Sequence, residues 1–158
     1  MDIAYFKMID EIVAVSADLS KITCVAVVPT TSTLFEGHFP GNPILPGALS
    51  IEIMAQAAGF LGMLNVGLTK MGYLLAVENA RFRTVIRPGT TLTAKATLTH
   101  LGSGYGAFRC TLEAGSQVAS ADIRIKLSDF GNEILRGSVL DRVNRLGLSE
   151  RVGVADAE

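Results

Sequence analysis

Residues 48–66 constrain the fold most, because they predict a long helix with almost no polar face. Leu, Ile, Met and Ala dominate the segment, and Pro46 stands where the first turn would begin, a position that proline favours. The polar residues in its interior are Ser50, Glu52 and Gln56. A helix on the surface of a globular protein carries a whole polar face, so this helix must be covered on nearly every side.

A membrane could also cover such a helix, and residues 44–64 have the length to span a bilayer. Their content argues against it. Pro46 and Gly47 lie near the start, and Glu52 and Gln56 lie in the middle, where hydrocarbon disfavours a carboxylate. No Lys/Arg cluster flanks the segment. We therefore expect a second subunit or an apolar ligand to bury extra surface in this chain, which is 49% hydrophobic and only 18% charged.

The rest of the chain predicts mainly strands separated by Gly-bearing turns, which indicates an α+β domain with a curved antiparallel sheet around the helix. The last three strands follow one another closely and predict a meander. A short, loosely packed helix and a disordered end are expected in a C-terminal extension, residues 130–158, after a main domain of residues 1–129. The predicted strands are residues 8–16, 21–28, 73–77 with a continuation through 81–83, 90–101, 105–113 and 117–127.

Charge and cysteine content exclude several classes of protein. The net charge of −1 does not favour non-specific binding to nucleic acid. The N-terminus lacks a basic region followed by an apolar one, so no secretory signal is expected. Cys24 and Cys110 stand alone in apolar segments and are expected to be reduced core residues, with no metal-ligand spacing around them. These features together predict a cytoplasmic protein.

The loop before the helix, residues 35–47, holds three of the five prolines, three glycines and His38, one of the two histidines. Such a loop is rigid, and rigid loops hold functional side chains in place. A histidine there titrates near neutral pH and can serve as a base. By itself, His38 is as easily explained as a structural residue.

Three further residues that could take part in catalysis follow His38 in the first turns of the predicted helix: Gly47, Glu52 and Gln56. The N–H of Gly47 would point out of the helix N-terminus, where it can stabilise an oxyanion. Glu52 in apolar surroundings can remain a protonated acid, and Gln56 follows four residues later on the same face. Glu52 could instead belong to an exposed polar wedge on the helix, with Gln56 as its second member, or to a buried ion pair. The joint pattern favours β-elimination next to a carbonyl group, with a base, an acid and an anion-stabilising N–H.

Residues 37–59, GHFPGNPILPGALSIEIMAQAAG, resemble the signature of bacterial 3-hydroxyacyl-acyl-carrier-protein dehydratases. Residues 5–10, YFKMID, and residues 81–89, which contain RFR and VIRPG, resemble this family more loosely. The resemblance covers roughly residues 5–128, and its central motif is long and specific.

The resemblance implies a hot-dog fold and a dimer, or a multiple of dimers, in which His38 of one subunit acts with Glu52 of the other. It implies that the N–H of Gly47 contacts the thioester carbonyl and that Gln56 supports Glu52. The substrate would be a (3R)-3-hydroxyacyl chain on acyl carrier protein, and the product a trans-2-enoyl chain and water. No metal or redox cofactor is implied. An apolar tunnel is implied, with Phe39, Pro46 and Ala48 along it and Tyr73 near its mouth. Tyr73 could instead be an ordinary packing residue of a strand.

Glu52, where the isomerising branch carries Asp, places the chain with relatives that dehydrate only. The chain departs from the pattern at its start, which lacks the PHR.P stretch, and at Ile53, where a smaller residue is commoner. The extension from residue 130 is similar to those of relatives specialised for very long acyl chains. The basic set Arg81, Arg83 and Arg87 would meet the acidic carrier protein, or would only protect a strand edge.

Two rival readings remain at this point. One is a hot-dog thioesterase or a hydratase of coenzyme A esters, although such enzymes usually lack the loop of residues 37–47. The other is a non-catalytic acyl-binding subunit, which would have no use for a buried carboxyl group.

Overall fold

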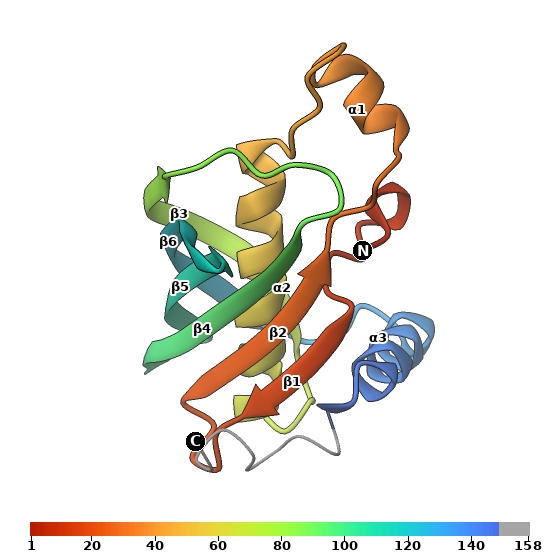
Figure 1. Ribbon diagram of the computed structural model, residues 1–158. Helices are drawn as coiled ribbons and strands as arrows, with labels where there is room; N and C mark the ends of the chain where they lie inside the picture. Colours follow the sequence, from red (N-terminus) through yellow and green to blue (C-terminus); the bar gives the residue numbers. More distant parts are fainter. Residues whose placement is uncertain (149–158) are drawn as a thin grey trace.

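A curved antiparallel sheet surrounds one long helix in the computed structural model, which describes residues 1–148 (Figure 1). The predicted α+β layout is confirmed. The elements in chain order are η1 (Ile3–Tyr5), β1 (Glu11–Val15), β2 (Lys21–Val27), α1 (Thr33–Gly37), α2 (Gly47–Asn65), β3 (Met71–Phe82), β4 (Thr91–Gly102), β5 (Tyr105–Ala114), β6 (Ser116–Ser128) and α3 (Glu133–Arg145).

The six strands lie in the order β1-β2-β4-β5-β6-β3, and each neighbouring pair is antiparallel. The predicted meander of β4, β5 and β6 is confirmed. Gly104 and Gly115 both have positive φ and turn the chain between these strands, as glycine does without steric cost. β1 and β3 therefore form the two edges of the sheet.

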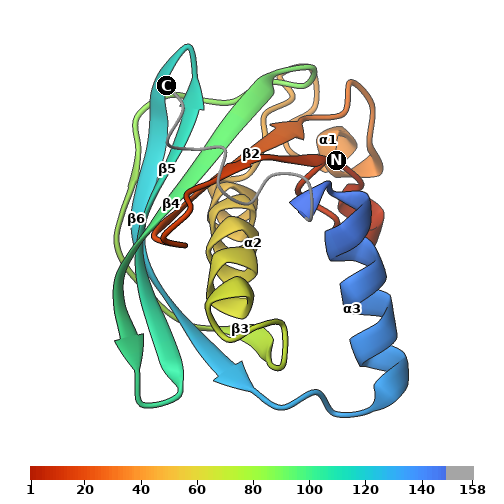
Figure 2. The same cartoon turned by 90° about the horizontal axis from the view of Figure 1, so that it is seen from below.

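Helix α2 lies in the concave side of the sheet, with α3 on its other side (Figure 2). It is the one helix within residues 1–148 that has the length and apolarity to cross a membrane. More than half of it is packed inside the domain, which accounts for its lack of a polar face. Its buried residues are Ser50, Ile53, Met54, Ala55, Ala57, Ala58, Phe60, Leu61, Gly62 and Met63.

The predicted terminal helix is present as α3, and it meets the hydrophobic core at its C-terminal end. Val143 is fully buried, and Leu146 and Leu148 are nearly so. The carbonyl of Leu146 accepts a hydrogen bond of 2.9 Å from the N–H of Ile12, which ties the end of the helix to edge strand β1. This contact joins positions far apart in the chain, which helical spacing alone does not reveal. The predicted disordered end lies outside the described residues.

Candidate active site

His38 is held by backbone hydrogen bonds at the end of the short helix α1. Its N–H donates to the carbonyl of Leu34 at 3.0 Å, and its carbonyl accepts from the N–H of Ile44 at 3.0 Å. The side chain of Ser32 caps the start of α1, and Phe35 anchors the helix by burial. We did not predict α1 from the sequence, although a serine at its N-cap is a recognisable start signal.

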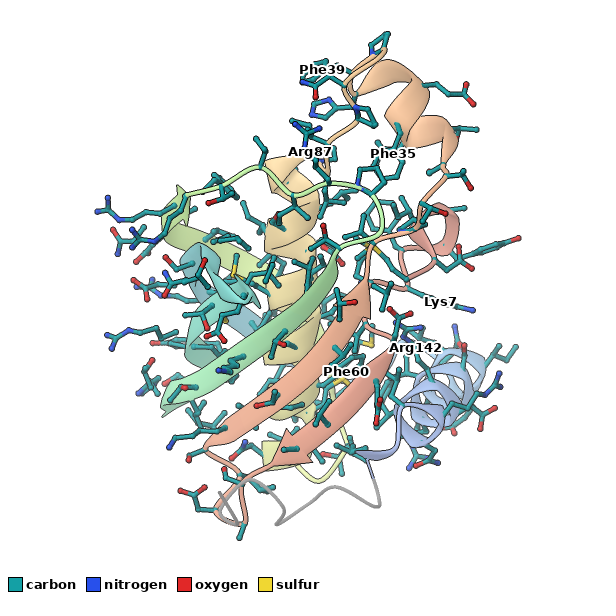
Figure 3. The ribbon with its side chains drawn as sticks, viewed as in Figure 1. Lys7, Phe35, Phe39, Phe60, Arg87 and Arg142 are labelled. Carbon is teal, nitrogen blue, oxygen red and sulfur yellow. The ribbon has the colours of Figure 1, made fainter. Side chains whose placement is uncertain are left out.

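The imidazole ring of His38 is half-buried and stacks on the ring of Phe39, with 4.1 Å between ring centroids. Neither ring nitrogen has a hydrogen-bond partner within residues 1–148, so both remain available to a ligand. Arg87 steadies the loop tip, because its Nη1 donates to Oδ1 of Asn42 at 2.9 Å. Figure 3 shows Arg87 between the tip that carries Phe39 and the start of α2. The loop thus fixes the backbone of His38 and leaves its ring free.

Gly47 is the first residue of α2, after Pro46 at the N-cap. Across the part of the chain that the structure describes, its N–H has no acceptor, as expected for a first helical turn. A Cβ added here would lie 3.2 Å from ring atoms of Phe82, so the lack of a side chain at Gly47 lets the Phe82 ring approach the start of the helix closely. Gly47 lines a hollow of about 350 Å³ with Phe82 and Arg83. A carbonyl oxygen at this helix end would meet a free N–H and the positive end of the helix dipole.

Glu52 and Gln56 lie one turn apart on α2 and are hydrogen-bonded, with 2.8 Å from Nε2 of Gln56 to Oε1 of Glu52. Nε2 also donates to the carbonyl of Phe6 at 2.6 Å. Oε1 of Gln56 accepts from the N–H of Met8 at 3.1 Å and from Nη2 of Arg142 at 3.5 Å. Turning the amide over would set oxygen against oxygen and N–H against N–H. One orientation of the Gln56 amide therefore satisfies all its partners.

The Glu52 carboxyl group lies in a pocket of about 320 Å³ between α2, α3, the N-terminal segment and the edge of the sheet. Most of the lining is apolar, which suits an alkyl chain. The cations Lys7 and Arg142 lie at the same pocket and come from opposite ends of the chain. The apolar lining includes Phe6, Ala55, Phe60, Met63, Met71, Leu74, Ile125 and Val139.

The single chain does not bring the predicted base and acid together, because His38 is absent from the lining of the Glu52 pocket. Of the predicted tunnel residues, Phe39 is 48% exposed at the loop tip and Tyr73 is 43% exposed on β3. Pro46 and Ala48 lie at the start of α2, away from the pocket. The predicted tunnel is therefore not continuous within one chain.

The predicted docking set Arg81, Arg83 and Arg87 is exposed, at the end of β3 and in the following loop. The backbone N–H of Arg83 donates to Val118, and the side chain of Arg87 is engaged by Asn42. The side chain of Arg87 therefore holds the loop of residues 35–47 through Asn42, in addition to any role in docking.

Sequence reasoning missed Lys7 and Arg142. Arg142 belongs to the helix expected in the C-terminal extension, and no role was predicted for it. It follows Val139 by three residues, and this spacing places both side chains on neighbouring parts of one helix face. This three-residue spacing was the sequence feature that could have placed Arg142 beside an apolar residue of the helix.

The predicted reduced core cysteines are confirmed: Cys24 and Cys110 are free and buried. Burial raises the pKa of both thiols to about 12. No group of three or more His, Cys, Asp and Glu that could hold a metal ion occurs within residues 1–148.

Comparison with known proteins defines the family. Residues 2–122 match the FabA-like domain. The chain belongs to the FabA-like domain family. One similar member is the 3-hydroxyacyl-acyl-carrier-protein dehydratase FabZ of Wolbachia pipientis subsp. Culex pipiens, 37% identical over 127 residues, which are 78% of this chain and 87% of that protein.

Solved structures show the same fold. A chain of the dehydratase heterocomplex ApeI:P from Xenorhabdus doucetiae has a TM-score of 0.65 at 19% identity, over 83% of this chain and 89% of that one. A thioesterase from Haemophilus influenzae has a TM-score of 0.59 at 18% identity, over 77% and 80% of the two chains. The predicted hot-dog fold of this FabA-like chain is confirmed. Since dehydratases and thioesterases share that fold, the fold alone does not select the reaction.

Proposed function

We propose that this protein is a hydro-lyase that converts (3R)-3-hydroxyacyl chains on acyl carrier protein into trans-2-enoyl chains, in fatty acid or lipid biosynthesis. Family membership and the FabZ relative support the reaction class. The observation that carries the proposal is the carboxyl group of Glu52, which Gln56 orients at an apolar pocket on an enclosed helix. An alkyl chain fits such a lining, and a positioned carboxyl group can release a hydroxyl as water.

In the proposed reaction, His38 takes the proton from C2 of the substrate. The C2–H electron pair forms the C2=C3 double bond as the C3–O bond breaks, and Glu52 gives its proton to the departing hydroxyl. The N–H of Gly47 donates to the thioester oxygen, where negative charge develops. The free ring nitrogens of His38 and the unpaired N–H of Gly47 support these roles.

The contacts of Gln56 also indicate which carboxyl oxygen carries the proton. Nε2 of Gln56 donates to Oε1 of Glu52, so Oε1 acts as an acceptor. The proton of the neutral acid then resides on Oε2, the oxygen left for the substrate. Gln56 thus both fixes the position of the carboxyl group and leaves its protonated oxygen facing the substrate.

Two subunits are needed to complete this site, with His38 of one chain facing Glu52 of the partner subunit. Strand β3 is an unpaired sheet edge, and it exposes Tyr73, Leu74, Leu75 and Phe82, each by more than 40%. An exposed apolar sheet edge invites pairing with another strand, and a second copy of β3 gives a symmetric interface. We therefore assign this edge to a homodimer or a multiple of dimers.

The dimer would also complete the acyl tunnel, with Phe39, Pro46 and Ala48 at its catalytic end and Tyr73 at its mouth. Arg81, Arg83 and Arg87 would meet the acidic carrier protein at the same edge. Glu52 in place of Asp supports dehydration without isomerisation. We propose that the protein acts in the cytoplasm. No cofactor is assigned.

The test supplies 3-hydroxyacyl chains on carrier protein, from short to very long, and follows enoyl absorbance, with free thiol measured in parallel. We expect enoyl product, no thiol release and no shifted double bond. Thiol release without enoyl product would identify a thioesterase instead, and binding without turnover would identify an acyl-binding subunit. Sedimentation should show a dimer or a multiple of dimers. A stable, active monomer would contradict the shared site.

A further inference from the structure

We propose that Arg142 of helix α3 is a positioning residue that holds the amide of Gln56 and, through it, the carboxyl group of Glu52. This inference rests on the proposed function, in which Glu52 is the acid. It gives the C-terminal helix, which lies beyond the matched family region, an indirect part in the reaction.

The chain of contacts is continuous from α3 to the acid. Nη2 of Arg142 donates to Oε1 of Gln56 at 3.5 Å and to the carbonyl of Ile9 at 3.4 Å. Gln56 in turn donates to Oε1 of Glu52 at 2.8 Å. A cationic donor at the amide oxygen polarises the amide, so its N–H becomes a stronger donor toward Glu52. Arg142 thus acts on Glu52 without touching it.

Helix α3 meets the domain on both sides of Arg142. Val143, next to Arg142, is fully buried, and Val139, one turn earlier, lines the pocket that holds Glu52. Figure 3 shows Arg142 on the side of α3 that faces the domain, near Phe60. These neighbouring contacts place the guanidinium group beside the amide of Gln56.

Charge near the pocket is unevenly distributed. Lys7 and Tyr5 from the N-terminal segment and Arg142 from α3 face it, whereas β3 and β6 contribute only apolar side chains and Gly72. Partial burial lowers the pKa of Arg142, while the carboxylates of Asp10 and Asp2 act in the opposite direction. Arg142 is therefore a partly desolvated cation, which strengthens its hydrogen bond to the amide oxygen of Gln56.

Arg145 is a matched control on the same helix. Its side chain is 80% exposed and pairs with Asp141 at 3.8 Å, and it does not line the pocket. Arg142→Met keeps the length and apolar stem of the side chain while removing its charge and donors. Arg145→Met makes the same change away from the site.

The experiment measures turnover of a 3-hydroxyacyl chain on carrier protein across pH for the full chain, together with the NMR signals of the Gln56 side-chain amide. We expect Arg142→Met to lower kcat about tenfold with little change in KM, as loss of a charged hydrogen bond implies. Because a cationic donor behind the Gln56 amide is removed, the pH profile of kcat should differ from that of the wild type. The Gln56 amide signals should shift or broaden. Arg145→Met should match the wild type in each measurement.

Equal kcat, pH profile and Gln56 signals in the two methionine variants would overturn the proposal. If Arg142→Met does not fold, Arg142→Lys takes its place against Arg145→Lys. Unequal Gln56 signals in the lysine pair then support the contact, and equal signals reject it. An inactive wild type would refute the proposed function, whereas an active wild type with an unaffected Arg142→Met variant would refute only the role of Arg142.

Discussion

The loop that carries His38 and the pocket that carries Glu52 hold their functional groups in opposite ways. His38 is fixed through its backbone, by Leu34 and Ile44, a few residues away in the chain. Glu52 is fixed through its side chain, by Gln56, whose own partners lie 48 to 86 residues away. The proposed base therefore depends on local chain geometry and the proposed acid on tertiary packing.

This difference suits the two roles. A base needs a ring nitrogen that is free to accept a proton, and a fixed backbone with unpartnered ring nitrogens supplies it. A general acid must present one particular oxygen, which requires a hydrogen bond at the other. Changes to the loop should therefore alter the approach of the base, whereas changes around Gln56 should alter the aim of the acid.

The largest effect is expected from removing either reacting group. His38→Ala and Glu52→Gln should each lower kcat at least about a hundredfold, the usual scale for general acid–base catalysis. Enoyl absorbance measures the rate, and a melting curve checks folding. If both folded variants keep the wild-type rate, the assigned roles are wrong.

Replacing Gln56 by Leu should lower kcat about tenfold and the free energy of unfolding by about 1 kcal/mol, because the N–H of Met8 and the carbonyl of Phe6 lose their partner. Asn65→Leu is the matched control on α2, since its amide donates to the carbonyls of Leu19 and Leu61. It should cost similar stability and leave kcat unchanged. Equal losses of kcat in both variants would mean that Gln56 only stabilises the fold. Urea titration supplies the stability values.

Arg87→Met tests the loop and should lower kcat about threefold, because the Asn42 contact is a single exposed hydrogen bond. A small thioester without carrier protein isolates this effect from docking. Arg81→Met should leave that small-substrate rate unchanged, since its side chain has no hydrogen bond or ion pair within residues 1–148. With carrier protein, both variants should raise KM. If Arg87→Met and Arg81→Met both lower kcat threefold on the small thioester, the hydrogen bond between Arg87 and Asn42 does not explain the loss.

The smallest effect on activity is expected from modifying the two cysteines of the hydrophobic core, which lie outside the loop and the pocket. Since the pKa of Cys24 and Cys110 is raised from 9.0 to about 12, folding favours the protonated thiols. Their contribution to stability is complete below about pH 9 and is lost as pH rises toward 12. Iodoacetamide at about pH 8 should therefore label them only in urea, and activity should not change. Rapid labelling of the folded protein, followed by mass spectrometry, would show that the core opens.

Much of the fold was predictable, because each element has its own periodicity. The enclosed helix, the three-strand meander and the position of the loop all follow from spacing within short segments. Helix α1 was missed because five residues carry little periodic signal, and its serine cap was the one cue. The pairing of β3 with β6 across a long stretch of chain depends on contacts that spacing does not encode.

The amino-acid sequence by itself determined which groups are available: an imidazole in a rigid loop, an N–H at a helix start, and a carboxyl and an amide one turn apart on an apolar helix. Residue type and helical spacing are local properties, so these inferences needed no coordinates. Only the tertiary structure decided that His38 and Glu52 lie apart in one chain and that Arg142 meets Gln56. Those relations join residues brought together by packing of the core, and packing depends on the whole chain at once.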